Sequence, residues 1–475
     1  MIIQRADIEY VLNKAELEED KLIASLYDIG DLLPIKLREK VVIGDYLQKI
    51  LAKGKIIIAK HEEDYVGIIA YYDNDSINRK AYVSILGVKS SFQGIGIAST
   101  LMRMMEDDAI KSCMNQNCLH VNKSNERAIA FYRSRGYVAI AANKDSFLMT
   151  KLLAFPFKNI TPIIELPSTI FEKNGIELMV KLDGLISYPY GGNNGRKAIY
   201  FLNYALYNNY THLVTNGGID SNHVRAIAIG CQMLGLECHI ILHYEGSDVS
   251  YYDSINYKIL KSLTHNIKVC KNDEIGKYMD DEIELIKKEG GKPLYIWGGG
   301  HSPLGTMAYY DAFQEYTSQL GNSEVRPNYI FLATGTGTTQ AGLLAGNKGD
   351  KTKIIGISIS RDRERQTNVI KESLNSFYSY FGIGKEMKGE EIEVVDRYLG
   401  NGYGALDDRV LNTIDDYIKK GIILDPVYTG KAFYGMLQEI ENNKIEKGSR
   451  VLFWHTGGFM NYIEFKNSTQ IVLSN

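Results

Sequence analysis

The sequence contains little cysteine, which argues against a disulfide-stapled or zinc-clustered fold. Its five cysteines include no pair at metal-ligand spacing: Cys113, Cys118, Cys231, Cys238 and Cys270. The nine histidines are scattered along the chain, with no HExxH pair and no cluster with cysteine. We therefore predict reduced thiols, a cytoplasmic protein, and no structural or catalytic zinc or other metal.

The sequence also lacks an excess of one charge and any long apolar run. Lysine and arginine total 54 and aspartate and glutamate 57, so the net charge is −3 and the pI about 6.3. This balance offers no electrostatic footprint for nucleic acid or an anionic membrane. No apolar stretch reaches the roughly 18 residues of a membrane span, and residues 1–10 contain no signal-peptide core. We expect no nucleic-acid partner, no membrane and a cytoplasmic location.

The length indicates more than one domain. A chain of 475 residues is too long for one typical core, and its 45% hydrophobic and 23% charged composition is ordinary for folded proteins. A short junction with two prolines, residues 151–162, separates two differently patterned parts. We predict domains over residues 1–155 and 156–475.

The segment from Tyr190 to Arg225 organises the second part. It reads as a glycine turn, a helix, a short apolar strand, a second glycine turn and another helix. The glycines at 191–192 and 217–218 permit close backbone approach. Free N–H groups at two neighbouring helix N-termini would make a place for an anion. An ordinary αβ crossover with tight turns is the alternative.

A glycine-threonine loop follows a predicted strand at residues 329–333. Its residues can curl into a nest of N–H and hydroxyl donors suited to a phosphate dianion: Thr334, Gly335, Thr336, Gly337 and Thr338. No lysine follows, as a nucleotide P-loop would require. Because strands and helices alternate from residue 163 onward, we predict open parallel sheets with the ligand beyond the carboxyl ends of the strands.

The first part contains a comparable turn. Strands predicted at residues 56–59, 65–72 and 81–88 precede a glycine-rich turn, and a helix follows from Ser99. Helical periodicity also covers residues 17–28 and 36–53. The turn again directs main-chain N–H groups toward an anion, although its spacing is not GxGxxG.

The turn Gln-Gly-Ile-Gly-Ile-Ala at residues 93–98 and the later segment from His120 to Tyr137 resemble the two motifs of the GNAT acyl-CoA N-acetyltransferases. The resemblance implies that acetyl-CoA is bound by Val88, Gln93, Gly94, Gly96, Ala98 and Asn125. It also implies that Tyr132 protonates the departing thiolate, a role that suits a phenol; a packing tyrosine is the alternative. Glu62, Glu63 and His120 are the candidates for the acceptor base.

In the second part, the pattern GGN-x-x-RK followed by GG-x-x-SN resembles the pyridoxal-phosphate enzymes of the D-cysteine desulfhydrase and 1-aminocyclopropane-1-carboxylate deaminase family, from Thr161 to about Phe465. The cofactor contacts that this resemblance implies are Asn194, Lys197, Asn222, Thr334, Gly335, Thr336, Gly337, Thr338 and Thr429. Ser221, Tyr403 and Tyr428 are implied for acid–base work. Thr429 stands where the deaminase branch has a glutamate, which favours the desulfhydrase branch.

The family places its Schiff-base lysine directly after GGN, where this sequence has Asn194. An amide cannot form an imine, so the usual covalent attachment is lost. Three interpretations stay open: a cofactor-binding domain with altered or lost lyase chemistry, a working lyase in which Lys197 substitutes, and a domain that no longer binds the cofactor and is kept as a binding or interaction module. By resemblance, Lys197 is a phosphate-binding lysine.

The predicted fold class is α/β, with an N-terminal GNAT α/β domain and a C-terminal tryptophan-synthase-β-like (fold type II) domain with open parallel sheets. The resemblance implies a bifunctional enzyme, an acetyl-CoA-dependent N-acetyltransferase fused to a pyridoxal 5'-phosphate-binding, lyase- or deaminase-like domain. The alternative is a single acetyltransferase whose C-terminal pseudoenzyme binds an amino acid or supports dimerisation. We expect a small-molecule amine or amino-acid substrate and a homodimer.

Overall fold

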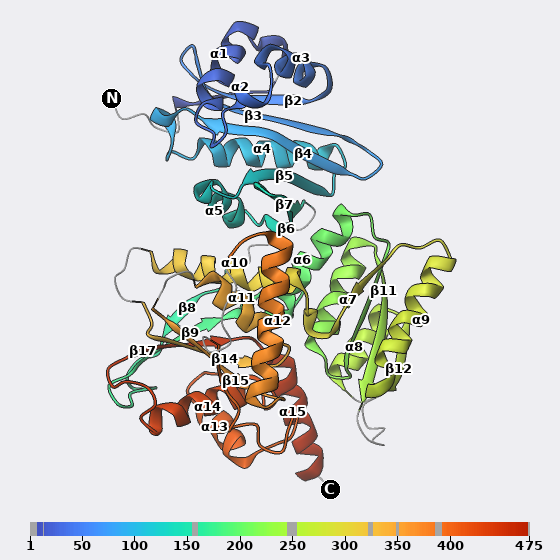
Figure 1. The fold of residues 1–475 in the computed structure, drawn as a ribbon, viewed down its shortest axis with the longest axis vertical. Helices are drawn as coiled ribbons and strands as arrows, with labels where there is room; N and C mark the ends of the chain where they lie inside the picture. The colour runs from blue at the N-terminus through green and yellow to red at the C-terminus, as the bar shows by residue number, and fades with distance from the viewer. Residues whose placement is uncertain are drawn as a thin grey trace. The chain divides into compact units, whose positions relative to one another are not determined.

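The computed structural model describes residues 7–12, 14–153, 160–244, 254–321, 326–347, 351–384 and 392–473, with side chains described to residue 467. The chain divides into two compact units, Met1–Lys158 and Asn159–Asn475 (Figure 1). The boundary predicted between residues 155 and 156 lies outside the described residues. Among the helices described, none is both long and apolar enough to cross a membrane.

In the first unit, the described strands form one mixed sheet in the order β1-β2-β3-β4-β5-β7-β6. The strands are β1 (Glu9–Val11), β2 (Lys55–His61), β3 (Asp64–Asp75), β4 (Lys80–Val88), β5 (Gln116–Asn122), β6 (Val138–Ala142) and β7 (Ser146–Leu152). The helices are α1 (Glu19–Gly30), α2 (Leu37–Lys40), α3 (Ile43–Lys53), α4 (Ile97–Lys111) and α5 (Glu126–Ser134). Alternate strand residues such as Ile56, Ile58 and Ile68 are buried in one cluster with Leu26 of α1 and Leu47 of α3.

The hairpin predicted from residues 56–72 is confirmed. Strands β2 and β3 pair antiparallel, with His61 opposite Asp64, so the charged residues between them form its tip. The helix predicted over residues 36–53 is instead two helices, because Val41 adopts an extended backbone after α2. Two consecutive β-branched residues, Val41 and Val42, disfavour a continuous helix there.

The neighbouring strands β4 and β5 are parallel but pair over only part of their length. Their register runs from Lys80 opposite Gln116 to Val83 opposite Leu119 and then stops. Strand β4 nevertheless continues to Val88, and β5 continues past residue 119. The sheet therefore splits between these two strands at their carboxyl ends, where the chain enters the turn before α4.

The second unit contains two sheets. The smaller sheet has the order β12-β11-β10-β13, and all of its described neighbours are parallel. Its strands are β10 (His212–Gly218), β11 (Glu237–Tyr244), β12 (Ile267–Lys271) and β13 (Pro293–Ile296). Helices α7 (Asn222–Leu234), α8 (Ile255–Leu263) and α9 (Ile275–Lys288) lie around it (Figure 1). Val214 and Ile241 of the sheet are buried with Met279 and Ile286 of α9.

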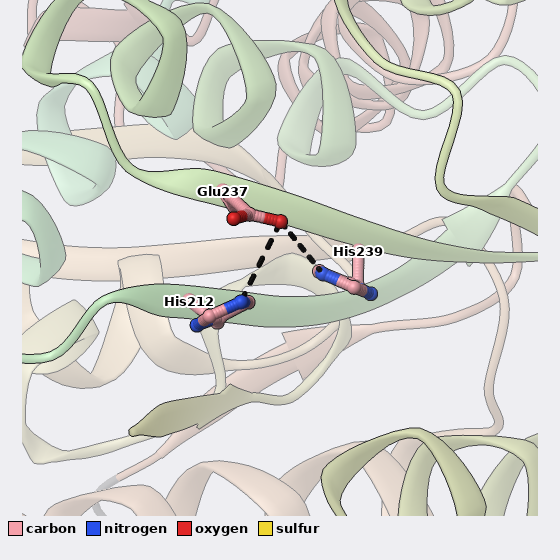
Figure 2. A group of neighbouring side chains, drawn as sticks. All are labelled: His212, Glu237 and His239. Carbon is pink, nitrogen blue, oxygen red and sulfur yellow. Dashed lines mark ion pairs between the residues drawn. The ribbon is translucent and has the colours of Figure 1, made fainter. Parts of the chain in front are cut away.

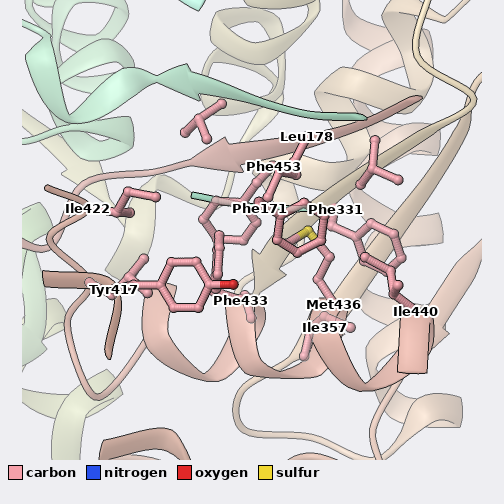
Figure 3. Close-up of a cluster of buried hydrophobic side chains, with 14 of the residues drawn as sticks. Phe171, Leu178, Phe331, Ile357, Tyr417, Ile422, Phe433, Met436, Ile440 and Phe453 are labelled. Carbon is pink, nitrogen blue, oxygen red and sulfur yellow. The ribbon is translucent and has the colours of Figure 1, made fainter. Parts of the chain in front are cut away.

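The larger sheet has the order β16-β15-β14-β17-β9-β8, with only β8 antiparallel among the described pairs. Its strands are β8 (Ile163–Glu165), β9 (Glu177–Leu182), β14 (Tyr329–Thr334), β15 (Lys353–Ser358), β16 (Glu393–Val395) and β17 (Arg450–His455). The remaining helices are α6 (Asn193–Tyr207), α10 (Pro303–Leu320), α11 (Thr338–Gly346), α12 (Arg363–Phe381), α13 (Asp408–Ile418), α14 (Thr429–Glu441) and α15 (Phe459–Leu473). Figure 3 shows Phe331, Ile357 and Phe453 of this sheet packed with Phe433 and Met436 of α14.

The parallel order confirms the predicted open sheets and sets where a ligand can bind. Parallel strands bring their carboxyl ends to one edge of each sheet, and loops at such edges form the binding crevices of this architecture. Strands β10, β14 and β17 lead into loops that begin at Ile219, Gly335 and Thr456.

Candidate active sites

A buried lysine lies against the loop that follows β14. The Lys197 Nζ donates hydrogen bonds to Thr338 Oγ1 at 2.7 Å and to the Gly299 carbonyl oxygen at 3.1 Å. The residue is only 1% exposed, and both of these partners are neutral oxygens. Burial lowers the pKa of Lys197 to about 7, because an ammonium without an anion is poorly solvated there.

Glycines bring further donors close to this amine. Gly337, the N-cap of α11, has φ +82°, and Gly299 has φ +68°. A Cβ at Gly299 would meet the Thr336 side chain at 2.5 Å, so the two loops approach closely only because glycine stands there. The hydroxyls of Thr336 and Thr338 are 3.4 Å apart. A helix N-terminus, two hydroxyls and one ammonium therefore make a donor set for a dianion.

The first turn of α6 is held by the loop after β17. Gly192 has φ +55°, and a Cβ there would collide with the Thr456 carbonyl oxygen. The Asn193 N–H donates to that oxygen at 2.9 Å, and its side-chain amide donates to Thr339 Oγ1 at 3.4 Å. Asn194 follows on the same turn and is partly buried. Residue 194 is therefore part of a helix start that two loops fix in place.

Arg196, the residue before Lys197, belongs to a buried ion network. Its Nη2 pairs with Asp183 Oδ1 at 2.8 Å and its Nη1 with Glu315 Oε2 at 2.7 Å. Burial alone would raise the pKa of Asp183, but the Arg196 and Lys181 cations and the hydrogen bonds from Arg196 and Tyr309 together outweigh it, and that pKa falls to about 2. Asp183 accepts three further hydrogen bonds, from Thr161 Oγ1, Tyr309 Oη and Trp454 Nε1. Breaking one partner of such a buried network would be strongly destabilising.

The end of β10 leads to Ser221 and Asn222. The Ser221 Oγ accepts the Val224 N–H at 3.3 Å and caps α7, which confirms the predicted helix start. The Asn222 Nδ2 donates to Asn461 Oδ1 at 2.5 Å, and its Oδ1 accepts from Arg225 Nη1 at 2.8 Å. These two hydrogen bonds use one of the two Nδ2 hydrogens and one of the two Oδ1 lone pairs of Asn222.

Two unsatisfied polar atoms lie in the same region. The His223 Nε2 is 3.1 Å from Thr215 Oγ1, whereas its buried Nδ1 and the buried Asn216 Nδ2 have no hydrogen-bond partner among the described residues. Burial lowers the pKa of His223 to about 3, so the ring is neutral. Buried polar atoms without partners are rare, and at the carboxyl end of β10 they favour a polar ligand. Neither Asn216 nor His223 was predicted as a site residue from the sequence, although His223 directly follows the predicted residues Ser221 and Asn222.

The two predicted tyrosines come together. The hydroxyls of Tyr403 and Tyr428 are 2.5 Å apart, and Tyr403 is 59% exposed. Burial and the neighbouring Tyr403 raise the pKa of Tyr428 well above its ordinary value. A pair at this distance can pass a proton from one oxygen to the other.

Thr429 is part of a helix cap. Its Oγ1 donates to Asp425 Oδ1 at 2.6 Å, and the same carboxylate accepts the N–H groups of Val427, Tyr428 and Thr429 at the start of α14. The hydroxyl proton of Thr429 is therefore committed to Asp425. The sequence reasoning missed Asp425, although an aspartate just before a helix is a capping signal.

In the first unit, the glycine turn links β4 to α4. Gly94 and Gly96 have φ +87° and +91°, and Gly96 is the N-cap of α4. The Gln93 Nε2 donates to the Val88 carbonyl oxygen at 2.9 Å, and its Oε1 accepts from Arg127 at 2.6 Å. Ala98 lies in the first turn of α4. The turn presents a helix N-terminus beside the split between β4 and β5, as an anion site requires.

The remaining predicted residues of this unit lie on α5. Asn125 caps the helix, its Oδ1 accepting the Ala128 N–H at 3.1 Å. Tyr132 is 8% exposed, and its ring centroid is 5.6 Å from that of Tyr137. Burial raises the pKa of Tyr132 further above its ordinary value, so the phenol keeps its proton.

The three candidates for an acceptor base differ in their surroundings. Glu63 pairs with Lys21 at 3.2 Å, and it lies beside Glu62 at the tip of the β2–β3 hairpin. His120 follows the last residue of β5 that pairs with β4, so it stands at the opening between these strands. Desolvation lowers the pKa of His120, which favours the neutral, basic imidazole.

The chain is thus a two-domain α/β protein, and each unit has a glycine turn at a helix N-terminus of the kind that suits an anion. A model of the acetyltransferase (GNAT) family matches residues 31–137, and a model of the pyridoxal-phosphate dependent enzyme family matches residues 155–457. The chain belongs to the pyridoxal-phosphate dependent enzyme family and carries an N-terminal GNAT domain.

The chain is similar to two groups of relatives over its second unit. It is 34% identical over 301 residues to a protein of Pyrococcus furiosus named "Putative 1-aminocyclopropane-1-carboxylate deaminase". The matched region covers 63% of this chain and 89% of that protein. It is 30% identical over 293 residues to the 1-aminocyclopropane-1-carboxylate deaminase of Burkholderia vietnamiensis, with 60% and 87% covered. Among solved structures, an ACC deaminase homologue superposes with a TM-score of 0.58 at 31% identity, covering 66% of this chain and 94% of that one.

Proposed function

We propose that the chain is bifunctional. Its first unit is an acetyl-CoA-dependent N-acetyltransferase acting on a small amine or amino acid. Its second unit holds pyridoxal 5'-phosphate without a covalent lysine at position 194 and has altered or lost lyase chemistry toward an amino acid. The observation that carries the second half is Lys197, which is buried against Gly299 and Thr338 and has no anionic partner among the described residues.

The residues fit the phosphate end of this cofactor. A buried ammonium lies beside the N-terminus of α11 and the Thr336 and Thr338 hydroxyls, which together would compensate a dianion. The bound phosphate would in turn supply the charge that Lys197 lacks. The unpaired Nδ1 of His223 and Nδ2 of Asn216 are further polar groups that a bound ligand could satisfy.

The residues do not fit the aldehyde end in the usual way. Asn194 offers no amine, and Lys197 is held at the phosphate loop. Turning Lys197 toward another position would require rotating the start of α6. That rotation would pull Arg196 away from Asp183 and Glu315, which form a buried ion network. The structure therefore disfavours Lys197 as a replacement for the missing lysine.

Pyridoxal phosphate supplies an electron sink for bonds at the α-carbon of an amino acid. Around it, the Ser221 hydroxyl and the Tyr403–Tyr428 pair would hold or move protons on the substrate, since the two phenol oxygens are 2.5 Å apart. Thr429 would instead position the start of α14 through Asp425.

In the first unit, the acceptor nitrogen would attack the thioester carbonyl of acetyl-CoA. A C–N bond forms and the C–S bond breaks. The nitrogen gives up a proton to a base, for which Glu62, Glu63 and His120 are the candidates, and the thiolate takes a proton from the Tyr132 hydroxyl. Burial keeps Tyr132 protonated over the physiological range, as this role requires. The turn from Gln93 to Ala98 would bind the pyrophosphate.

A second candidate function follows from the same asparagine. With Asn194 in the lysine position, the second unit could serve the acetyltransferase only by binding an amino-acid ligand. This pseudoenzyme would need neither the phosphate donors nor the tyrosine pair, so their presence favours the cofactor-binding proposal.

The deciding experiment introduces a lysine at position 194. Full-length wild type, Asn194→Lys and the control Asn193→Lys are incubated with pyridoxal 5'-phosphate, and their absorbance is recorded before and after borohydride reduction. We expect cofactor bound without a covalent label in wild type, a reducible label at residue 194 in Asn194→Lys, and none in Asn193→Lys. A label at Lys197 in wild type would support a relocated lysine instead. Absence of bound cofactor in all three proteins would refute the proposal and favour the pseudoenzyme.

A further inference from the structure

The smaller sheet of the second unit carries three metal-ligating side chains at its amino edge. Strands β10 and β11 are parallel, with His212 opposite Glu237 and Val214 opposite His239. Alternate residues of a strand share a face, so these three side chains lie on the face that packs against α9. Figure 2 shows the two imidazoles and the carboxylate converging, with one Glu237 oxygen between the rings.

The three donor atoms lie nearly at metal-ligand separation. The Glu237 Oε2 is 3.5 Å from His212 Nε2 and 3.8 Å from His239 Nε2, and all of the donor atoms lie within 4.8 Å of one another. In a tetrahedral zinc site with zinc–ligand bonds of about 2.0 Å, ligand atoms lie about 3.3 Å apart. A charge-assisted hydrogen bond would be shorter, at about 2.8 Å. The spacing therefore suits a shared cation better than direct ion pairs.

The far side of the His239 ring is fixed by a buried carboxylate. Its Nδ1 lies 2.6 Å from Glu282 Oε1 of α9, and the Glu282 side chain is 5% exposed. The Nδ1 therefore carries the proton, which leaves a lone pair on Nε2 for a metal. The Asn266 amide, 3.3 Å from that Nε2, has the geometry to donate to the same lone pair. A carboxylate behind a histidine is the arrangement that orients metal-bound imidazoles in proteins.

The second histidine is oriented in a similar way. The His212 Nδ1 lies 2.7 Å from Thr211 Oγ1, while its Nε2 points toward Glu237. The side chains of His212 and His239 are 15% and 10% exposed, and that of Glu237 is 63% exposed. Two nearly buried nitrogens and one exposed oxygen leave an open side for a water ligand and for entry of the ion.

We propose that His212, Glu237 and His239 bind one divalent transition-metal ion of the zinc class, with water as a fourth ligand. Two imidazoles and one carboxylate suit zinc rather than calcium or magnesium, which prefer oxygen ligands. The site is at the amino edge of the sheet, whereas the phosphate pocket lies at the carboxyl edges. The ion would therefore tie β10 to β11 and, through Glu282, to α9, and it would stabilise this sheet without entering the chemistry.

This proposal departs from our expectation of no metal site, which stays untested. The sequence expectation rested on linear spacing, and the parallel register joins residues that are distant along the chain. The sequence does contain one hint of this site, the pattern Glu-x-His at residues 237–239, because residues two positions apart on a strand point to the same face.

The test uses full-length protein stripped with a chelator and titrated with Zn²⁺ in a calorimeter. Wild type is compared with His212→Gln and Glu237→Gln; the controls are His265→Gln, an exposed histidine outside the cluster, and Glu284→Gln, an exposed glutamate on α9. We expect one equivalent bound by wild type and both controls. Substituting a residue that only hydrogen-bonds a metal ligand lowers metal affinity about 10–100-fold. Loss of a ligand itself, in His212→Gln or Glu237→Gln, should lower the Zn²⁺ affinity by at least as much.

A spectroscopic measurement on the same proteins supports the geometry. Co²⁺ in the proposed site should give the visible absorption of a tetrahedral ion, and Glu237→Gln should remove it. Glu237 is exposed, so its substitution should leave the circular dichroism unchanged. The proposal is overturned if wild type binds no Zn²⁺, or if His212→Gln and Glu237→Gln bind it as wild type does.

Discussion

Replacing Lys197 by methionine should change how the stability of the second unit depends on pH. The folded protein lowers the pKa of Lys197 from 10.5 to about 7. A shift of this size corresponds to roughly 5 kcal/mol of penalty on the charged form. Methionine has similar length and no charge, so the variant escapes this penalty while losing the hydrogen bonds to Thr338 and Gly299.

The direction of the pH effect follows from proton binding in the two states. The unfolded chain holds the lysine proton up to its ordinary pKa of 10.5, whereas the folded chain releases it near pH 7. Between these values the unfolded state binds more protons, so the unfolding free energy of wild type rises with pH. Relative to Lys197→Met, the rise should approach about 1.4 kcal/mol per pH unit above pH 7, and it should vanish at lower pH.

The assay can follow the second unit alone, because both tryptophans, Trp297 and Trp454, lie in it. Urea unfolding with selective tryptophan excitation, repeated across this pH range, gives the difference between wild type and variant. The control Lys277→Met removes an exposed lysine of α9 and should show no such slope. A difference that is independent of pH would refute the claim that Lys197 is a destabilised cation. Pyridoxal 5'-phosphate should also bind more weakly to Lys197→Met, by about 1.5–3 kcal/mol for one charged hydrogen bond.

Three further predictions concern other residues. Gly96→Glu should abolish coenzyme A binding, measured by calorimetry on the full chain, because it places a carboxylate at the N-cap of α4 where the phosphates would bind. Tyr132→Phe should lower kcat for acetyl transfer by roughly 10²–10⁴ with little change in coenzyme A affinity, since the phenylalanine ring has no proton to give. Thr429→Val should lower the unfolding free energy of the second unit by about 1–3 kcal/mol, because Asp425 loses a donor in a fully buried position.

Each of these predictions has a control. Gly96→Ala introduces the same backbone strain at φ +91° without a charge, so equal loss in both variants would contradict the pyrophosphate assignment. Unchanged turnover in Tyr132→Phe would leave Tyr132 as a packing residue. Thr413→Val removes an exposed hydroxyl that donates to the Arg409 carbonyl oxygen on α13, and the argument fails if Thr429→Val costs no more than this change.

Local sequence signals predicted most of the fold. Glycine turns flanked by apolar periods located the starts of α6, α7 and α11, because glycine and capping residues act within one turn of the chain. The helix over residues 36–53 was wrong because two valines outweighed the apolar spacing. The GNAT motifs and the GGN pattern were sufficient to anticipate both family matches.

Contacts between distant segments could not be predicted in the same way. The partner of Asn222 is Asn461 on α15, and the partners of Arg196 lie on α10 and after β9. Such pairs depend on how helices pack across the sheets, which periodicity does not report. The residues of the proposed metal site were not predicted for the same reason, since only the register of two parallel strands brings His212 to Glu237.

The helix start that carries Asn194 has a consequence for which side chains position 194 can accept. Gly192, Asn193 and Arg196 hold that turn through their own contacts, and none of the hydrogen bonds described for the turn uses the Asn194 side chain. A different side chain at position 194 would therefore leave these described contacts in place. The backbone of the turn can be set by its neighbours while the chemistry of residue 194 is varied on its own.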